Sequence, residues 1–394
     1  MQEPVVDVAV IGAGIVGLGI AWTALSSGRT VALIDPEPAQ GATFAAAGML
    51  APVSEYHYQE EALLGLMVES SRLWPEFAGS FGALGGYRET PTLVLGFDAA
   101  DRTALADLCS VQRGHGLDVE PVTVREARRL EPLLAPQLSC AFLTPGDHQV
   151  DPRRLHAAML ERFTDDGGTL MTERAEEVLW AEASAGRASG VRLSSGRTVW
   201  AREVVVANGL AAADLGGLPA DVRLPLRPVH GDILRLRVPE RLKPFLTSTV
   251  RGSVRGLPVY LVPREDGTVV IGATQREDGQ SGASAGGVHQ LLRDAQLLVP
   301  AVAELELEEV TARARPGTPD NAPLLGRVRG PDGQDLPGLV IATGFFRHGV
   351  LLTPVAARAV LELLDGTGGD RWAAFRPDRF SPGTLSQQTV EARA

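Results

Sequence analysis

Arg315 is the residue whose neighbours in the sequence most clearly suggest a chemical task. It lies in EVTARARPGTPDNAPLLG, where small and large side chains alternate as in a strand and a Pro-Gly turn is predicted directly afterwards. A guanidinium held at a rigid strand end can grip a carboxylate with two parallel hydrogen bonds, which fixes the orientation of the ligand as well as its position. The alternative is a surface ion pair with Glu308 or Asp320. For Arg313, a structural ion pair is the favoured interpretation.

The N-terminal residues carry a pattern that predicts dinucleotide binding. VDVAVIG is typical of a buried parallel strand, and GAGIVG supplies the G-x-G-x-x-G spacing with Gly12, Gly14 and Gly17. These glycines allow a tight turn, the approach of a diphosphate to the backbone, and close packing of helix on strand. A helix is predicted from Ile15 to Ser27. The next strand ends in Asp35, whose carboxylate suits ribose hydroxyls and repels a 2′-phosphate. The pattern does not separate NAD from FAD.

Two later segments favour a flavin. GATFAAAGML (residues 41–50) is rich in small residues, which would let its backbone lie flat against a large planar ring; the alternative is a helix start capped by Thr43. GLVIATG predicts a strand that runs into Phe345–Gly349 and then a helix from Val350 to Leu364. The N-terminus of such a helix stabilises anions, and a reduced flavin carries negative charge near N1 and the C2 oxygen. The alternative for this segment is a βα unit without a ligand.

Composition limits the other classes of function. The chain has 394 residues and a net charge of -11, so it lacks the basic surface that nucleic-acid binding needs. Its only lysine, Lys243, lies in a polar stretch, which argues against Schiff-base chemistry with pyridoxal phosphate. The two cysteines and seven histidines show no metal-ligand spacing, so no metal site is expected and a reducing cytoplasm fits. Glycines interrupt the apolar N-terminal segment, so no membrane segment is predicted.

The remaining segments predict an α/β chain with two domains. An amphipathic helix is expected within 149–170, and three short strands follow that return the chain to a doubly wound sheet. Alternating segments at 87–97 and 232–275, with an apolar-periodic helix at 288–305, indicate a separate antiparallel sheet. We therefore predict a discontinuous FAD-binding domain (1–80, 148–222 and 310–378) and a substrate-binding domain (81–147 and 223–309).

The order of these motifs resembles the FAD-dependent D-amino-acid oxidase family, whose fold is glutathione-reductase-like. The blocks that carry the resemblance are GAGIVG, Asp35, AAAGML, YLVPR with GATQ, RPGTPDNAPLLG and ATGFFRHGVLLTP, and they span nearly the whole chain. The resemblance implies a Rossmann-like FAD-binding domain, an antiparallel-sheet substrate domain and non-covalent FAD. The positions implied to bind the cofactor are Gly12, Gly14, Ile15, Val16, Gly17, Asp35, Pro36, Ala42, Thr43, Ala47, Gly48, Met49, Val178, Phe345, Phe346, Arg347, His348, Gly349, Val350 and Leu351.

The resemblance also implies a substrate site and a reaction. Arg315 would hold the substrate carboxylate, with Arg347 and Tyr260 completing the site. Glycine and other small amines, such as sarcosine and small D-amino acids, would transfer a hydride to flavin N5 with no catalytic side chain. His348 is the nearest titratable group, and a loop hydrogen bond is its favoured role. Dioxygen would then give hydrogen peroxide, and the imine would yield glyoxylate and ammonia or supply thiazole synthesis for thiamine. A cytoplasmic homotetramer is implied as well.

Three positions depart from the family pattern, and three other functions stay open. Gln275 stands where relatives can carry methionine, and His230 stands where a longer basic side chain is common; both bear on amine specificity. Arg313 stands where a small residue is expected.

The alternatives to an amino-acid oxidase are a D-amino-acid dehydrogenase that passes electrons to a quinone or carrier, a sarcosine-type oxidase, and a flavin-binding protein without amine turnover.

Overall fold

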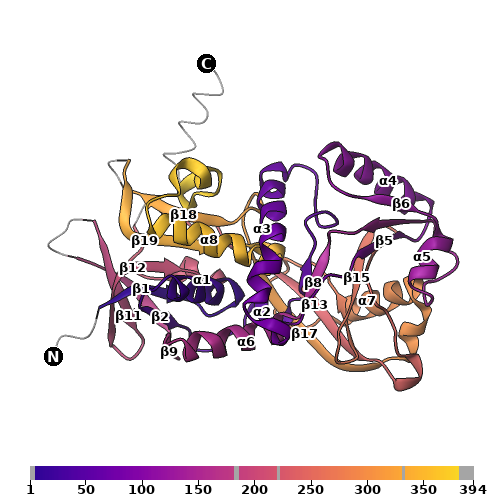
Figure 1. Cartoon of the computed structure of the whole chain (residues 1–394), viewed down its shortest axis with the longest axis horizontal. Helices are drawn as coiled ribbons and strands as arrows, with labels where there is room; N and C mark the ends of the chain where they lie inside the picture. Colours follow the sequence, from indigo (N-terminus) through magenta and orange to yellow (C-terminus); the bar gives the residue numbers. More distant parts are fainter. Residues whose placement is uncertain (1–4, 182–185, 220–221, 331–332, 381–394) are drawn as a thin grey trace, which may run out of the picture.

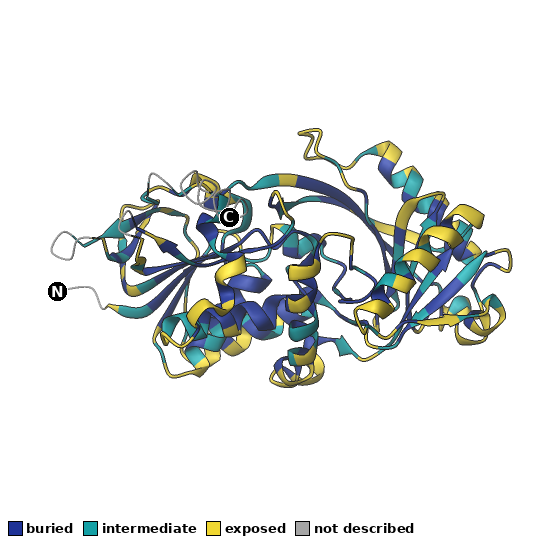
Figure 2. Ribbon diagram, turned by 90° about the horizontal axis from the view of Figure 1, so that it is seen from above, coloured by how far each residue is buried: buried dark blue, intermediate teal, exposed yellow. Residues whose placement is uncertain are grey.

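Two large sheets at opposite ends of an elongated molecule form the fold (Figure 1). The structure is a computed structural model and describes residues 5–181, 186–219, 222–330 and 333–380. Central strands such as β1 (Val6–Ile11), β2 (Val31–Ile34) and β13 (Arg227–Arg237) are buried along most of their length, whereas the outward faces of the surrounding helices are exposed (Figure 2). The α/β fold class predicted from the sequence is confirmed, because a Rossmann-like parallel sheet accompanies a second, largely antiparallel one.

The first sheet carries the dinucleotide fingerprint at its centre. Strand β1 lies between β2 and β12, parallel to both, so that Val10 is opposite Leu33 and Val205. Strand β19 extends the parallel part beside β12, whereas β10, β11 and β18 pair antiparallel. The strands are β1 (Val6–Ile11), β2 (Val31–Ile34), β9 (Thr169–Met171), β10 (Ala175–Trp180), β11 (Ala188–Leu193), β12 (Thr198–Val206), β18 (Leu324–Arg329) and β19 (Asp335–Thr343).

Helices cover one face of this sheet, and the β10–β11 hairpin covers the other. Residues of α1, α3, α6 and α8 share one apolar core with Val10 and Leu33, whereas Ile11 and Ile34 face Val178 and Val191. The predicted first helix is found with one residue less, and Gly28 follows its C-cap with φ +90°. The helices are α1 (Ile15–Ser26), α2 (Ala42–Ala45), α3 (Glu61–Gly79), α4 (Ala99–Gly114), α5 (Val124–Leu130), α6 (Pro152–Asp165), α7 (Ala285–Leu298) and α8 (Thr353–Leu364).

The second sheet has the order β17-β13-β16-β15-β14-β5-β7-β6. All of its pairs are antiparallel except β14 with β5, which is parallel. Residues of α7 and α5 pack on its apolar face. Helix α7 ends earlier than predicted because Pro300 follows it and its predecessor Val299 leaves the helical conformation. The strands are β5 (Thr92–Gly96), β6 (Glu120–Val122), β7 (Cys140–Thr144), β13 (Arg227–Arg237), β14 (Thr249–Val254), β15 (Leu257–Pro263), β16 (Thr268–Gly272) and β17 (Glu306–Gly317).

Strand β17 and a small third sheet connect the two ends of the molecule. The third sheet consists of β3 (Met49–Leu50), β8 (His148–Val150) and β4 (Tyr87–Arg88). The pairing of β17 with β13 continues to Gly317, which lies opposite Arg227. The domain boundary predicted at residue 310 therefore falls inside β17. We propose that the boundary lies after Gly317. The turn predicted directly after Arg315 also comes later, where the amide of Asn321 donates to the carbonyl of Thr318.

Candidate active site

A cavity of about 690 Å³ lies between the two large sheets. Its wall is formed by the fingerprint loop, α2 with the residues that follow it, the end of β12, the strands β13–β17 and the loop before α8. A cavity of this size is in the range that holds cofactors and small ligands. Most residues singled out in the sequence meet on this wall, although they lie as far apart as Gly12 and Leu351.

The predicted residues divide into those that line the cavity and those that do not. Gly17 packs α1 on the loop, because a Cβ there would lie 2.0 Å from the Gly12 oxygen. Pro36 is exposed, and Val178 is buried in β10 with its amide bonded to the carbonyl of Gly216. Those that line the cavity are Gly12, Gly14, Ile15, Val16, Asp35, Ala42, Thr43, Ala47, Gly48, Met49, Tyr260, Arg315, Phe345, Phe346, Arg347, His348, Gly349, Val350 and Leu351.

The fingerprint loop suits a dinucleotide for two reasons: its backbone conformation leaves room for one, and polar side chains beside it have unused hydrogen-bonding capacity. Gly12 has φ +104°, and a Cβ there would lie 2.6 Å from the Ala207 oxygen. Asp35 accepts from the amide of Ala13 at 2.7 Å and keeps further lone pairs that suit ribose hydroxyls. Half-buried Asn208 lines the cavity, and its buried Oδ1 has no hydrogen-bond partner among the described residues. The ribose hydroxyls of an adenosine diphosphate moiety would donate to these oxygens, whereas its phosphates suit the backbone amides at the N-terminus of α1.

The segment after β2 holds the start of α1. The hydroxyl of Thr43 accepts from the amide of Ile15 at 3.0 Å, so it caps α1 and not the short helix α2 in which it lies. The alternative considered from the sequence, a helix start capped by Thr43, is therefore not found. The N-cap of α2 is Gly41, which offers no side chain. This contact ties the small-residue segment to the fingerprint loop.

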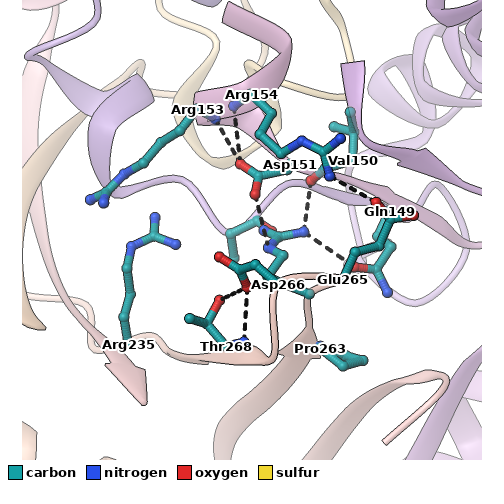
Figure 3. Close-up of polar contacts among 12 residues, drawn as sticks. Gln149, Val150, Asp151, Arg153, Arg154, Arg235, Pro263, Glu265, Asp266 and Thr268 are labelled. Carbon is teal, nitrogen blue, oxygen red and sulfur yellow. Dashed lines mark hydrogen bonds and ion pairs between the residues drawn. The ribbon is translucent and has the colours of Figure 1, made fainter. Parts of the chain in front are cut away.

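Arg264 fixes the small-residue segment from the other side. Gly48 has φ +71°, and a Cβ there would lie 2.0 Å from the Val150 oxygen. The buried Arg264 guanidinium donates to the carbonyls of Ala47 and Val150, and burial lowers its pKa to about 10. Figure 3 shows the nearby N-cap of α6, where Asp151 accepts from the backbone amides of Arg153 and Arg154. The arginine of YLVPR thus supports the small-residue segment, a role that was not predicted.

The loop before α8 differs from the prediction. The helix expected from Val350 begins at Thr353, because Pro354 suits only the first turn and residues 346–348 form a 3-10 turn. Phe346 has φ +47°, an uncommon conformation for a bulky residue that is found mostly at functional sites. Burial lowers the pKa of His348 well below its usual value, so its imidazole is neutral. Its Nε2 makes no hydrogen bond within the described ranges.

Arg315 is a cation without a carboxylate partner. Its guanidinium lies against the backbone of Gly231, where a Cβ would be 2.3 Å from Nη1, and Nη1 donates to the carbonyl of Thr274 at 3.4 Å. The two carboxylates considered from the sequence are engaged elsewhere: Glu308 pairs with Arg237 and Asp320 with Arg379. Across the part of the chain that the structure describes, Arg315 forms no ion pair. Burial lowers its pKa, and the neighbouring phenol opposes this shift.

Tyr260 lies beside Arg315 on the cavity wall. On β15 it is opposite Arg251 of β14 and Gly272 of β16. A Cβ at Gly272 would lie 2.4 Å from the phenol oxygen, so the absence of a side chain there makes room for the ring. Burial raises the pKa of Tyr260, with Arg315 opposing the shift, and the hydroxyl therefore stays protonated at neutral pH. An arginine and a phenol that converge on one space suit a small carboxylate.

Arg347 is already charge-balanced. It pairs with Glu60, and its Nε lies 3.5 Å from Oε2 of Glu55. Arg251 pairs with the same Glu55, and Asn321 donates to Glu60 at 3.1 Å. Burial lowers the pKa of Arg251 to about 10, with Arg347 adding to the shift. Two cations and two anions thus close one side of the cavity.

Of the two positions linked to amine specificity, only one lies on the cavity wall, and one further wall residue, Arg251, was not predicted. Gln275 lines the cavity as a polar group, whereas His230 is buried outside the lining. Arg251, the arginine of VRGSV, lies on the face of its strand that lines the cavity, opposite Tyr260 of β15. The alternation of side chains along VRGSV is the sequence signal that could have found it. Lys243 is exposed, pairs with Glu240 and is not part of the wall.

Neither a metal site nor a membrane span is found in the described residues. No group of three or more histidine, cysteine, aspartate or glutamate side chains there could hold a metal ion. No helix among them has both the length and the apolar character needed to cross a membrane.

The fold and the cavity define an FAD-dependent oxidoreductase. The family described as FAD dependent oxidoreductase (DAO) matches residues 7–363, and the chain belongs to this family. Its cofactor is FAD, which supplies hydride-accepting chemistry when bound.

Relatives and solved structures are similar over most of the chain. The glycine oxidase of Geobacillus kaustophilus is 32% identical over 366 residues, which cover 91% of this chain and 93% of that one. The bifunctional protein ThiO/ThiG of Synechocystis sp. is 32% identical over 98% of this chain but only 56% of its own length. The crystal structure of glycine oxidase from Geobacillus kaustophilus matches with a TM-score of 0.84 at 30% identity, covering 95% of this chain and 98% of that one.

Proposed function

We propose that the protein oxidises glycine and other small amines, such as sarcosine and small D-amino acids, with dioxygen as the electron acceptor. The products would be hydrogen peroxide and an imine that hydrolyses to glyoxylate and ammonia. The observation that carries the proposal is Arg315, a partly buried arginine that faces the cavity with no ion-pair partner among the described residues. The similarity to glycine oxidase supports the choice of a small substrate.

The residues of the wall would act by orientation. Arg315 would hold the substrate carboxylate with two hydrogen bonds, and the protonated Tyr260 would donate a further one. Arg347 would contribute less, because it is engaged by Glu60 and Glu55. We nominate no side chain as general base: the substrate ammonium must lose a proton, and burial lowers the pKa of His348 so far that its imidazole binds a proton only weakly.

The proposed assembly and location go with this activity. We propose a cytoplasmic homo-oligomer, a homotetramer by the resemblance, and an imine that is handed to thiamine thiazole synthesis. Size-exclusion chromatography with light scattering tests the first proposal, and a monomer at micromolar concentration would contradict it.

Non-covalent FAD is part of the proposal, because no residue is clearly set up for a covalent link. The purified protein should be yellow and should release its flavin into the supernatant when it is denatured with acid. Flavin that stays on the precipitated chain would show covalent attachment to cysteine, histidine or tyrosine.

Anaerobic mixing with a panel of amines tests the reaction. Glycine should bleach the visible flavin band, and admission of oxygen should restore it with one peroxide per bleached flavin. Bleaching that only a quinone or electron carrier reverses would favour a D-amino-acid dehydrogenase. A far higher kcat/KM for sarcosine than for glycine would favour a sarcosine-type oxidase. No bleaching with any amine would leave a flavin-binding protein without turnover.

A further inference from the structure

Arg313 is a second arginine of the cavity wall without a carboxylate partner. It lies two residues before Arg315 and therefore on the same face of β17. The structural ion pair expected for it is not found within the described ranges. Its Nε donates to the carbonyl of Gln40 at 2.9 Å, and its Nη1 donates to the carbonyl of Ala312 at 2.9 Å. The other two arginines of the wall, by contrast, are paired with Glu55 and Glu60.

The contacts of Arg313 place it on the nucleotide side of the cavity. Gln40 follows Ala39, whose amide donates to the carbonyl of Ala13 in the fingerprint loop at 3.2 Å. The guanidinium carbon lies 5.3 Å from the centre of the Phe44 ring in α2. The same ring holds Arg153 at 3.8 Å, so the aromatic side chain that supports Arg313 is itself fixed. Arg313 is thus positioned by the segment that links β2 to the small-residue loop.

The nucleotide side of the cavity is negatively charged, so a cation there would stabilise a bound diphosphate. Asp35 and Glu37 line the nucleotide side of the cavity, and the first turn of α1 contains no charged side chain. A diphosphate that approaches the backbone there brings two further negative charges, which repel the carboxylates. Helix N-termini offset part of this repulsion. An arginine whose Nη2 is not used by any described hydrogen bond can offset more.

We propose that Arg313 is a further cofactor-binding residue, whose guanidinium helps to hold the diphosphate of FAD. It would add a side-chain cation to a site that otherwise binds phosphate through backbone amides. The inference rests on the FAD binding of the family and not on the amine proposed above. It therefore stands or falls independently of the substrate.

Fluorescence titration of the apoprotein with FAD tests the proposal. Arg313→Gln should weaken FAD binding by about tenfold, the loss expected for one charge-assisted hydrogen bond. The dependence of affinity on salt should also flatten, because one ionic contact is lost. Arg313→Lys should recover part of the affinity. Riboflavin, which has no phosphate, should bind the parent and both variants equally.

Arg237→Gln is the matched control. Arg237 is at the end of β13, is half-buried and pairs with Glu308 away from the cavity, so its removal should leave FAD affinity unchanged. Thermal unfolding of each apoprotein checks that the variants are folded. Unchanged FAD affinity in Arg313→Gln would overturn the proposal, as would an equal loss for riboflavin. Intact FAD binding with weakened binding of iminodiacetate would assign Arg313 to the substrate instead.

Discussion

Arg315→Lys should cripple turnover and leave FAD bound. Lysine keeps the charge but loses the planar fork, so a carboxylate would be held in one place without a fixed orientation. We expect glycolate, a carboxylate without the reactive amine, to bind about ten- to a hundred-fold more weakly, which corresponds to the loss of a charged hydrogen bond. A spectral titration of the flavin band measures this loss beside the kcat/KM for glycine.

Arg313→Lys is the control for that variant, because it changes the same side chain on the same strand face two residues away. With FAD at saturating concentration, it should leave glycolate affinity near that of the parent protein. If Arg315→Lys bound glycolate as tightly as the parent and oxidised glycine equally well, Arg315 would be structural. Binding of the substrate carboxylate would then have to be assigned to Arg347.

Asp35→Ala should weaken FAD binding by about 1.5–3 kcal/mol, the range for a hydrogen bond to a charged group. The carboxylate also accepts from the amides of Ala13 and Glu37, so the loop itself could shift in this variant. Asp35→Asn keeps an acceptor for these amides and should lose less. Asp7→Ala, at the opposite end of the sheet, is the control. Equal FAD affinity in the parent and Asp35→Ala proteins would contradict the predicted ribose contact.

Residues in short motifs could be placed from the sequence, whereas their partners could not. Arg315 and Tyr260 belong to local patterns that also lie on the cavity wall. The pairing of Arg347 with Glu60 joins positions 287 residues apart, and no local pattern indicates it. Arg313 was expected to form a structural ion pair because the family resemblance places a small residue at this position. The backbone carbonyl that it meets comes from a segment 273 residues away.

Gly48→Ala tests the small-residue segment as an element. A Cβ at this position would lie 2.0 Å from a backbone oxygen of β8, and φ +71° is strained for any residue with a side chain. The segment must therefore move, and we expect a loss of FAD affinity of at least tenfold together with a lower Tm of the apoprotein. Gly41→Ala is the control, since a Cβ there meets no atom within 4 Å. Equal FAD affinity in both variants would show that the segment does not contact the flavin.

Elements with a strong local pattern were predicted well, and elements defined by tertiary contacts were not. The helix α6 was expected within 149–170 and is found from Pro152 to Asp165, because its N-cap, proline and terminal glycines are local signals. The start of α8 was placed three residues early, since the apolar pattern continues through a loop that faces the cavity. Periodicity does not distinguish burial in a core from burial beside a ligand site.

Glu309→Gln tests how the two ends of the molecule are joined. Glu309 of β17 accepts two hydrogen bonds from Arg153 of α6, at 2.9 and 2.6 Å. These bonds lower the pKa of Glu309 from 4.5 to about 2. A depressed pKa means that the charged pair stabilises the fold above pH 4.5 and that this contribution is lost as the pH falls from 4.5 towards 2. The variant should therefore melt below the parent at pH 7, and the difference in Tm should shrink through this window.

Glu265→Gln is the matched control for the pH dependence. Glu265 pairs with Arg154, the neighbour of Arg153, at 2.8 Å, and both side chains are exposed (Figure 3). Exposed pairs of this kind contribute about 0–1 kcal/mol, so the control should follow the parent at every pH. A constant difference in Tm between Glu309→Gln and the parent from pH 7 to pH 3 would contradict the proposal that the charged pair of Glu309 and Arg153 joins the domains.

At the scale of the whole molecule, the sequence indicated two domains but not their boundary. Strand β17 reads as one alternating segment, and its pairing partner β13 lies some eighty residues earlier in the chain. Only that pairing shows that residues 310–317 belong to the second sheet. The closure of the cavity between the sheets depends on the same long-range pairing, so its shape could not be deduced from local patterns.

The single lysine of the chain gives the molecule a practical property. Lys243 is exposed and outside the cavity wall, whereas the cations that line the cavity are arginines, which do not react with amine-selective reagents under mild conditions. A fluorophore ester or an activated surface would therefore couple at Lys243 or at the terminal amine and leave every wall cation unmodified. The protein could be immobilised in few orientations with its oxidising site open, as an electrode-bound amine sensor requires.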